Sequence, residues 1–84
     1  MSLYLAKIIV TLRKSILDPS GKAVYHAIDS LGMDGVKEVR IGKYVEMKLD
    51  SSSQEEAEIV TQAACNKLLA NPVMEDFTFS VEKL

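Results

Sequence analysis

The chain has 84 residues and a mass of 9.3 kDa, with 48% hydrophobic and 26% charged residues, which is the balance of one globular domain spanning residues 1–84. Ten basic against 12 acidic residues give a formal charge of −2 and a pI of about 5.3, so no net positive field favours nucleic acid or anionic lipid as a partner. Lys7 and Arg13 interrupt the only stretch that approaches the length of a membrane span or secretion signal. We therefore expect a cytoplasmic protein.

The single Cys65 and single His26 exclude an internal disulfide and any zinc-ligand spacing, so we expect no metal on this chain. They fall on different predicted helices, which argues against an activated nucleophile. The adjacent acids at residues 55–56 and 75–76 point to different sides of their elements and make no acid–base pair. Gly21-Lys22-Ala23 lacks the earlier glycine and the following Ser or Thr of a phosphate loop. No catalytic residue is predicted.

Residues 1–3 read as a remnant of cloning and carry no weight here. Apolar side chains alternate from residue 4 to residue 12, which predicts a strand. Asp18 directly before Pro19 is typical of a helix start, and Gly32 is typical of a helix end. A helix is therefore expected between them. Its buried stripe should consist of the apolar residues at helical spacing, namely Val24, Ala27, Ile28 and Leu31.

Two more alternating runs, residues 36–41 and 44–49, are joined at Gly42-Lys43 and predict a β-hairpin. Ser53 and Glu56 form a capping box that begins a second helix, which must stop before Pro72. The buried stripe expected on that helix is Ala57, Val60, Ala64 and Leu68. A last alternating run, residues 77–81, predicts the final strand.

The predicted order is β-α-β-β-α-β, which is the α+β, ferredoxin-like arrangement of two helices on one face of a four-stranded antiparallel sheet. This fold hosts many unrelated functions, so function must be argued from particular residues. One group of apolar side chains has no role in a monomer's core, because it lies on the sheet face away from the helices. The group consists of Leu5, Ile9 and Tyr44, and we expect it to be a dimer interface.

Four segments together resemble the PurS family, the small subunit of phosphoribosylformylglycinamidine synthase. The segments are Leu17-Asp18-Pro19-Ser20-Gly21-Lys22-Ala23, Val39-Arg40-Ile41-Gly42-Lys43-Tyr44, Leu68-Leu69-Ala70-Asn71-Pro72-Val73 and Met74-Glu75-Asp76-Phe77. The resemblance implies a non-catalytic subunit of de novo purine synthesis that bridges a glutaminase and a synthetase subunit as a dimer or higher oligomer. It also implies that the chain assists ammonia transfer, while the complex uses ATP, Mg²⁺ and glutamine.

By the same resemblance, two places are expected to bind the partner subunits. The expected partner-binding residues are Arg40, Gly42, Lys43, Tyr44, Asn71, Pro72, Glu75 and Asp76. Arg40 is the foremost candidate, because a guanidinium on a half-exposed strand can fork onto a partner carboxylate. A purely structural reading stays open, since Gly42 can serve only a turn and Asn71-Pro72 can serve only to end a helix.

The alternative function is a regulatory module in which a ferredoxin-like dimer holds a small metabolite. Such modules place a Gly-rich turn between the first strand and the first helix to admit the ligand. Here residues 13–17 read Arg-Lys-Ser-Ile-Leu, which disfavours that function without excluding it.

Overall fold

The computed structural model describes all residues from 1 to 84. Its elements in chain order are β1 (Ser2–Leu12), α1 (Pro19–Ser30), β2 (Gly42–Ser51), α2 (Gln54–Ala64), the π-helical turn η1 (Cys65–Leu69) and β3 (Glu75–Lys83). The α+β class is confirmed. The first strand starts at Ser2, so residues 2 and 3 belong to the fold. Neither helix has the length and hydropathy that crossing a membrane would require.

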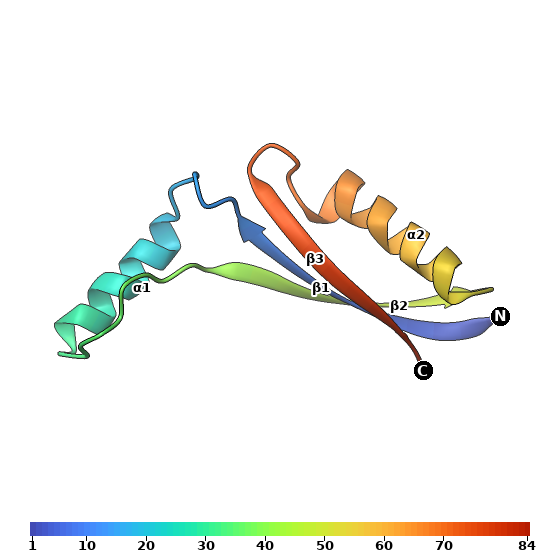
Figure 1. The fold of residues 1–84 in the computed structure, drawn as a ribbon, viewed down its shortest axis with the longest axis horizontal. Helices are drawn as coiled ribbons and strands as arrows, with labels where there is room; N and C mark the ends of the chain where they lie inside the picture. Colours follow the sequence, from blue (N-terminus) through green and yellow to red (C-terminus); the bar gives the residue numbers. More distant parts are fainter.

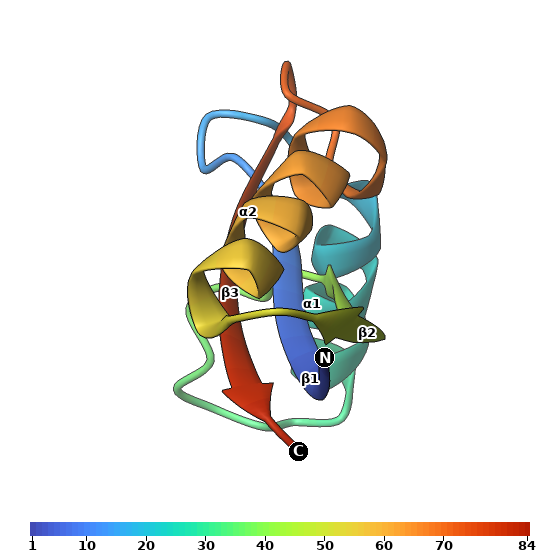
Figure 2. The same ribbon diagram turned by 90° about the vertical axis from the view of Figure 1, so that its right-hand side faces the viewer.

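The three strands form an antiparallel sheet in the order β2-β1-β3. The central strand β1 places Ile8 opposite Val45 of β2 and opposite Phe79 of β3. α2 covers the face that carries these three side chains, and Figure 2 shows β3 at one edge of the sheet and β2 at the other. The buried core cluster between helix and sheet consists of Ala6, Ile8, Val10, Cys65 and Ala70.

The predicted hairpin is wrong. Residues 36–41 are extended but pair with no strand, and they run straight on into β2, where Gly42 lies opposite Thr11. A tight hairpin turn at Gly42-Lys43 needs positive φ angles, and only Gly32 (φ 77°) and Gly35 (φ 92°) have them. The sheet therefore has three strands and not four.

α1 does not join α2 on the sheet, so the expectation of two helices on one face is also wrong. Instead, α1 and residues 36–41 form an arm that projects from the end of the sheet (Figure 1). The molecule measures 52 × 27 × 14 Å and its radius of gyration is 16.5 Å, whereas a compact chain of this length has a radius of about 12 Å. The arm accounts for this elongation.

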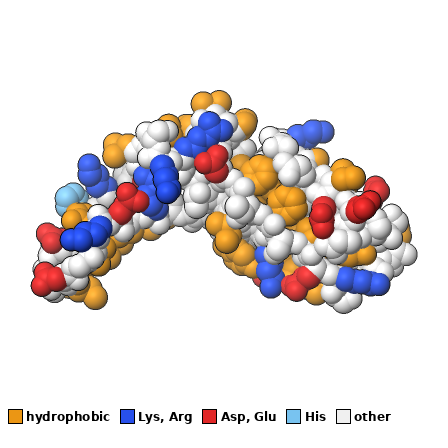
Figure 3. Space-filling model, viewed as in Figure 1, with side chains coloured by type: hydrophobic (Ala, Val, Ile, Leu, Met, Phe, Trp, Pro, Cys, Tyr) orange, Lys and Arg blue, Asp and Glu red, His pale blue; other side chains and the backbone are white.

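The projecting arm leaves apolar side chains uncovered. In the expected stripe of the first helix, Val24 is 39% exposed and Leu31, directly after α1, is 75% exposed, because no strand and no other helix makes an extensive contact with α1. In the expected stripe of α2, Ala57 is buried, but Val60 is 45% exposed and Leu68 is 82% exposed. Hydrophobic side chains run along the concave side of the arm in Figure 3. An apolar helix and an apolar strip beside α2 therefore both lack a neighbour within the chain.

The predicted helix boundaries hold because they depend on local bonds. Asp18 caps α1 by accepting from the Gly21 N–H, and Ser53 caps α2 by accepting from the Glu56 N–H. α2 loosens into η1, where the Ala70 N–H donates to the Cys65 carbonyl at 3.0 Å, and the helix ends before Pro72.

Candidate functional site

Arg40 ties the arm to the sheet. Its Nη2 donates to the carbonyl oxygens of Leu12 at 3.2 Å, Arg13 at 2.8 Å and Ile16 at 3.2 Å, so it closes the loop between β1 and α1. Bonds from a guanidinium to backbone carbonyls are charge-assisted and hold the loop in one conformation. Arg40 thus has a structural role that the sequence did not indicate.

Asp18 performs the second part of this attachment. One carboxylate oxygen accepts from the Gly21 N–H at 2.9 Å and the other accepts from the Ile41 N–H at 2.7 Å. These bonds, with the nearby charge of Arg40, hold the pKa of the Asp18 carboxyl below its usual value. The close approach also requires Gly21, because a Cβ there would collide with the Val39 carbonyl oxygen. Asp18 therefore locks α1 against the extended segment of the arm.

The corner between η1 and β3 meets the start of the arm. Arg13 donates from Nη2 to the Pro72 carbonyl at 2.6 Å, and its Nε lies 3.3 Å from Asp76. Lys43 donates to the Leu69 carbonyl at 3.1 Å, and its ammonium lies 3.9 Å from Glu75. The two expected partner-binding places, which are about thirty residues apart in the chain, are thus adjacent in space.

Asn71 makes this corner rigid. Its side-chain oxygen accepts from the Val73 N–H at 2.9 Å, and its backbone N–H donates to the Glu75 carboxylate at 2.7 Å. Val73 is nevertheless 75% exposed and Met74 is 41% exposed. The corner therefore presents apolar side chains from a turn whose backbone is already ordered, which lowers the entropic cost of binding a partner.

We call this region the elbow surface. It consists of Arg13, Arg40, Lys43, Asn71, Pro72, Val73, Glu75 and Asp76. The sequence missed Arg13, which contacts both sides of the elbow; its only signal is a basic residue directly after the first strand. Gly42 belongs to the sheet and not to a turn, because it pairs with Thr11 of β1. The position requires glycine, since a Cβ there would lie 2.6 Å from the Val10 carbonyl oxygen.

The expected dimer residues lie on the sheet face opposite α2. Ile9 and Tyr44 are cross-strand neighbours and are 51% and 57% exposed, and Leu5 lies half-buried farther along the same face of β1. Between them, Lys7 pairs with Glu82 at 3.0 Å. The Tyr44 hydroxyl donates to Glu46 at 2.9 Å, and this bond raises the pKa of the Tyr44 phenol. The face is therefore an apolar stripe crossed by a pair of opposite charges.

The groups that a catalytic site would need are dispersed. Cys65 is buried in the core, and its burial raises the pKa of the thiol, so it stays protonated at neutral pH. His26 is exposed on α1, in the arm, and contacts Tyr25 edge-on. No three His, Cys, Asp or Glu side chains are grouped so as to hold a metal ion.

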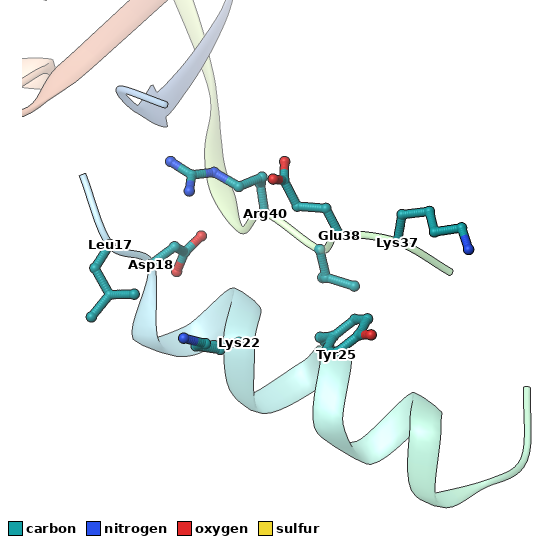
Figure 4. A pocket seen from close by; sticks show the side chains of 8 residues that line it. Leu17, Asp18, Lys22, Tyr25, Lys37, Glu38 and Arg40 are labelled. Carbon is teal, nitrogen blue, oxygen red and sulfur yellow. The ribbon is translucent and has the colours of Figure 1, made fainter. Parts of the chain in front are cut away.

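A hollow of 270 Å³ lies between α1 and residues 37–40. Figure 4 shows that its charged side chains diverge: the Arg40 guanidinium points toward the sheet, whereas Lys37 points away along the segment. A metabolite site needs polar groups that converge on one ligand. The hollow therefore gives no support to the regulatory-module alternative.

Comparison with known proteins agrees with the resemblance drawn from the sequence. The family model named PurS, described as phosphoribosylformylglycinamidine (FGAM) synthase, matches residues 5–83. The chain belongs to the PurS family. A relative from Bacillus subtilis, the PurS subunit of phosphoribosylformylglycinamidine synthase, is 42% identical over 82 residues, covering 98% of this chain and 96% of the relative.

Solved PurS structures share the same chain fold. The Thermus thermophilus protein has a TM-score of 0.86 at 40% identity, with 98% of each chain covered. A chain of the Thermotoga maritima PurLQS structure has a TM-score of 0.85 at 30% identity, with all of both chains covered. Like these family members, the chain is a subunit of phosphoribosylformylglycinamidine synthase, a glutamine-dependent ligase complex of purine biosynthesis. The elongated arm is therefore a feature of the family fold.

Proposed function

We propose that the chain is the non-catalytic subunit that bridges the glutaminase and synthetase subunits and assists ammonia transfer between them. In the complex, formylglycinamide ribonucleotide is converted to formylglycinamidine ribonucleotide with glutamine and ATP. The observation that carries this role is the elbow surface, which is rigid, exposed and partly apolar although it is not needed for the core. The place of action we propose is the cytoplasm.

ATP, Mg²⁺ and glutamine are assigned to the other subunits, because the helix starts of this chain do not suit phosphate. The Asp18 carboxylate fills the N-terminus of α1 and already accepts two backbone N–H groups. The first turn of α2 carries Glu55 and Glu56, which repel an anion. In the complex, the chain's own residues would position the subunits, while ATP with Mg²⁺ would activate the substrate and glutamine would supply the ammonia on the other subunits.

The uncovered apolar surfaces support a homodimer formed by exchange of arms. A strip beside α2 lies where the first helix of a ferredoxin-like fold belongs, and it is formed by Val60 and Leu68 with the inner side chains of β2. The apolar face of α1 has the matching chemistry but cannot reach this strip in its own chain, because residues 36–41 lead it away. The α1 of a second copy can cover it.

The open edge of β2 supports the same exchange. The Leu84 N–H bonds to the Leu3 carbonyl, so the odd-numbered backbone groups of β1 face β3 and the even-numbered groups face β2. By the register, even-numbered residues 44–50 of β2 then point their backbone groups outward. Residues 36–41 of the second copy can pair there, which completes the predicted four-stranded sheet from two chains. Exchange of identical elements is a low-cost route to a closed dimer.

The outer sheet face with Leu5, Ile9 and Tyr44 stays, in this proposal, an interface between copies. It lies opposite α2 and remains exposed after the arms exchange, so it would join two exchanged dimers. The apolar stripe carries a positive and a negative side chain, Lys7 and Glu82. Two copies related by a two-fold axis could therefore place opposite charges against each other. Ile9→Lys should then reduce a tetramer to a dimer in light scattering.

Reconstitution tests the bridging role. The chain alone should hydrolyse neither glutamine nor ATP, and adding it to the glutaminase and synthetase subunits should produce a stable three-component complex with glutamine-dependent activity. Size-exclusion chromatography with light scattering and a glutamine-hydrolysis assay measure both. Glutamine-dependent synthesis of equal rate without the chain would contradict the proposal, as would turnover by the chain alone that Cys65→Ala abolishes.

A further inference from the structure

The outer edge of β3 remains open even after the exchange of arms. β3 is the last strand on its side of the sheet, and the exchange covers only the edge of β2 on the other side (Figure 2). The Leu84 N–H donates inward to the Leu3 carbonyl of β1, and the Met74 carbonyl accepts from the N–H of Arg13, directly after β1. Backbone groups alternate along a strand, so those of Phe77, Phe79 and Val81 point outward.

This edge already accepts one hydrogen bond from outside the sheet. The Gln54 side chain, at the start of α2, donates to the Val81 carbonyl at 2.6 Å and to Glu58 at 3.0 Å. Gln54 thereby occupies one end of the edge, while the outward-pointing backbone groups of Phe77 and Phe79 have no partner within the chain. Natural sheets usually block such edges with proline or inward-pointing charges, and the stretch from Phe77 to Val81 contains neither.

A groove runs beside the open edge on the α2 side. It has a volume of 410 Å³ and is lined by Glu55, Glu58, Ile59, Gln62 and Phe79. Ile59 is 66% exposed and supplies its apolar wall. A strand added to β3 would point alternate side chains into this groove, where an apolar residue meets Ile59 and Phe79 and a basic residue meets the two carboxylates.

We propose that β3 is extended by a short strand of one partner subunit, with an apolar and a basic side chain on the groove side and polar side chains on the other. This inference rests on the bridging function proposed above. Charge decides against a second copy pairing edge to edge, because two-fold pairing about Phe79 would bring Glu55 and Glu58 of both copies together. A basic segment of a partner instead neutralises them.

Hydrogen exchange of single amides tests the pairing directly. The chain is allowed to exchange alone and in the complex with the glutaminase and synthetase subunits, and the amides are then read by mass spectrometry with electron-transfer fragmentation. Pairing should slow the Phe77 and Phe79 amides by at least about ten-fold in the complex. Thr78 and Ser80, which already bond to β1, should change much less.

Charge reversal on α2 provides the second arm of the experiment. Glu58→Lys should weaken assembly by about ten-fold at low salt and reduce its salt dependence. Asp34→Lys makes the same charge change at an exposed position in the turn at the arm's tip, outside the groove, so it should leave assembly unchanged. Circular dichroism and the mass of the free oligomer confirm that both variants fold.

The outcomes separate this inference from the proposed function. A complex that forms without slowed exchange at Phe77 and Phe79, or equal assembly of both variants, overturns the edge pairing alone. Slowed exchange of these amides in the isolated chain would identify a second copy as the occupant, for example through its residues 36–41, and also overturns the proposal. Failure of any three-component complex to form contradicts the bridging function itself.

Discussion

At the scale of single residues, Arg40 and Asp18 decide the shape of the molecule. From the sequence, Arg40 was expected to be a surface residue and Asp18 a helix cap. In the structure, Arg40 also bonds to the β1–α1 loop, and Asp18 bonds both to α1 and to Ile41. The angle of the arm is thus fixed by two side chains of opposite charge. Changing either should alter the arm while leaving the sheet and α2 intact.

Arg40→Met should destabilise the attachment of the arm, because the loop carbonyls lose their charged donor. A hydrogen bond to a charged group contributes about 1.5–3 kcal/mol. We expect the unfolding midpoint in urea to fall and residues 13–18 to exchange their amides faster. Lys37→Met, a matched change on an exposed side chain of the same segment, should leave both unchanged. Equal midpoints for the two variants would contradict a structural role for Arg40.

Asp18 predicts a pH dependence of stability. The folded state holds the pKa of this carboxyl below its unfolded value, so the stabilisation is complete above the unfolded pKa and is lost as the pH falls through the folded pKa. Urea unfolding measured from neutral pH down through this acid range should show the loss. Asp18→Asn should be less stable than wild type at neutral pH, and the difference should shrink on acidification. A constant difference at all pH values would remove Asp18 as the cause.

At the scale of elements, local sequence signals predicted both helices and the first strand correctly, but they did not predict the path of the chain between them. The caps at Asp18 and Ser53 and the alternation in β1 depend on neighbours a few residues away, and the structure confirms them. The alternation of apolar and polar side chains in residues 36–41 is equally compatible with a paired strand and with an unpaired arm. The choice between the two depends on long-range contacts, such as the close approach of Gly42 to the Val10 carbonyl, which no local pattern reveals.

The candidate site shows the same division. The stretches at residues 40–44 and 71–76 could be selected from the sequence by resemblance. Their adjacency could not, because it depends on Lys43 reaching Leu69 and on Arg13 reaching Pro72. Likewise, exposure of the apolar stripe of α1 follows from the direction of the arm and not from the stripe itself.

If the arm is an opened hairpin, a turn should close it. Inserting Asn-Gly between Gly42 and Lys43 supplies the positive φ angles of a two-residue hairpin loop. Residues 36–41 can then pair with β2 of their own chain, and α1 can cover its own apolar strip. The test uses the Ile9→Lys background, in which the outer sheet face no longer joins copies. In that background we expect a compact monomer near 9.3 kDa, measured by light scattering and X-ray scattering. Inserting Asn-Gly between Asp34 and Gly35, in the turn at the arm's tip, should instead leave the exchanged dimer intact. If the chain with the insertion after Gly42 is still a dimer, arm exchange is contradicted.

At the scale of the whole molecule, the elongated shape fits a part that joins others. In this proposal, the exchange of arms covers the concave side, and the outer sheet face joins further copies of the chain. The elbow surface and the β3 edge then remain available to bind the glutaminase and synthetase subunits. A thin domain of this size gains stability from each contact, since it buries little surface alone. Assembly and folding stability should therefore rise together.

The elbow surface can be separated from catalysis by the source of ammonia. Val73→Asp places a charge on the exposed tip of the corner, where the side chain is 75% exposed and contributes little to the fold. If Val73 is an apolar anchor for a partner subunit, the variant should bind about 30-fold more weakly, equivalent to ~2 kcal/mol. Glutamine-dependent synthesis should then fall steeply at low subunit concentration, while synthesis from added ammonium salt should fall less, because the synthetase subunit needs no transferred ammonia. Leu84→Asp, the same kind of change at an exposed site away from the elbow, is the control. Equal loss of both reactions would mean that the corner supports the synthetase itself and not the joining of the two subunits.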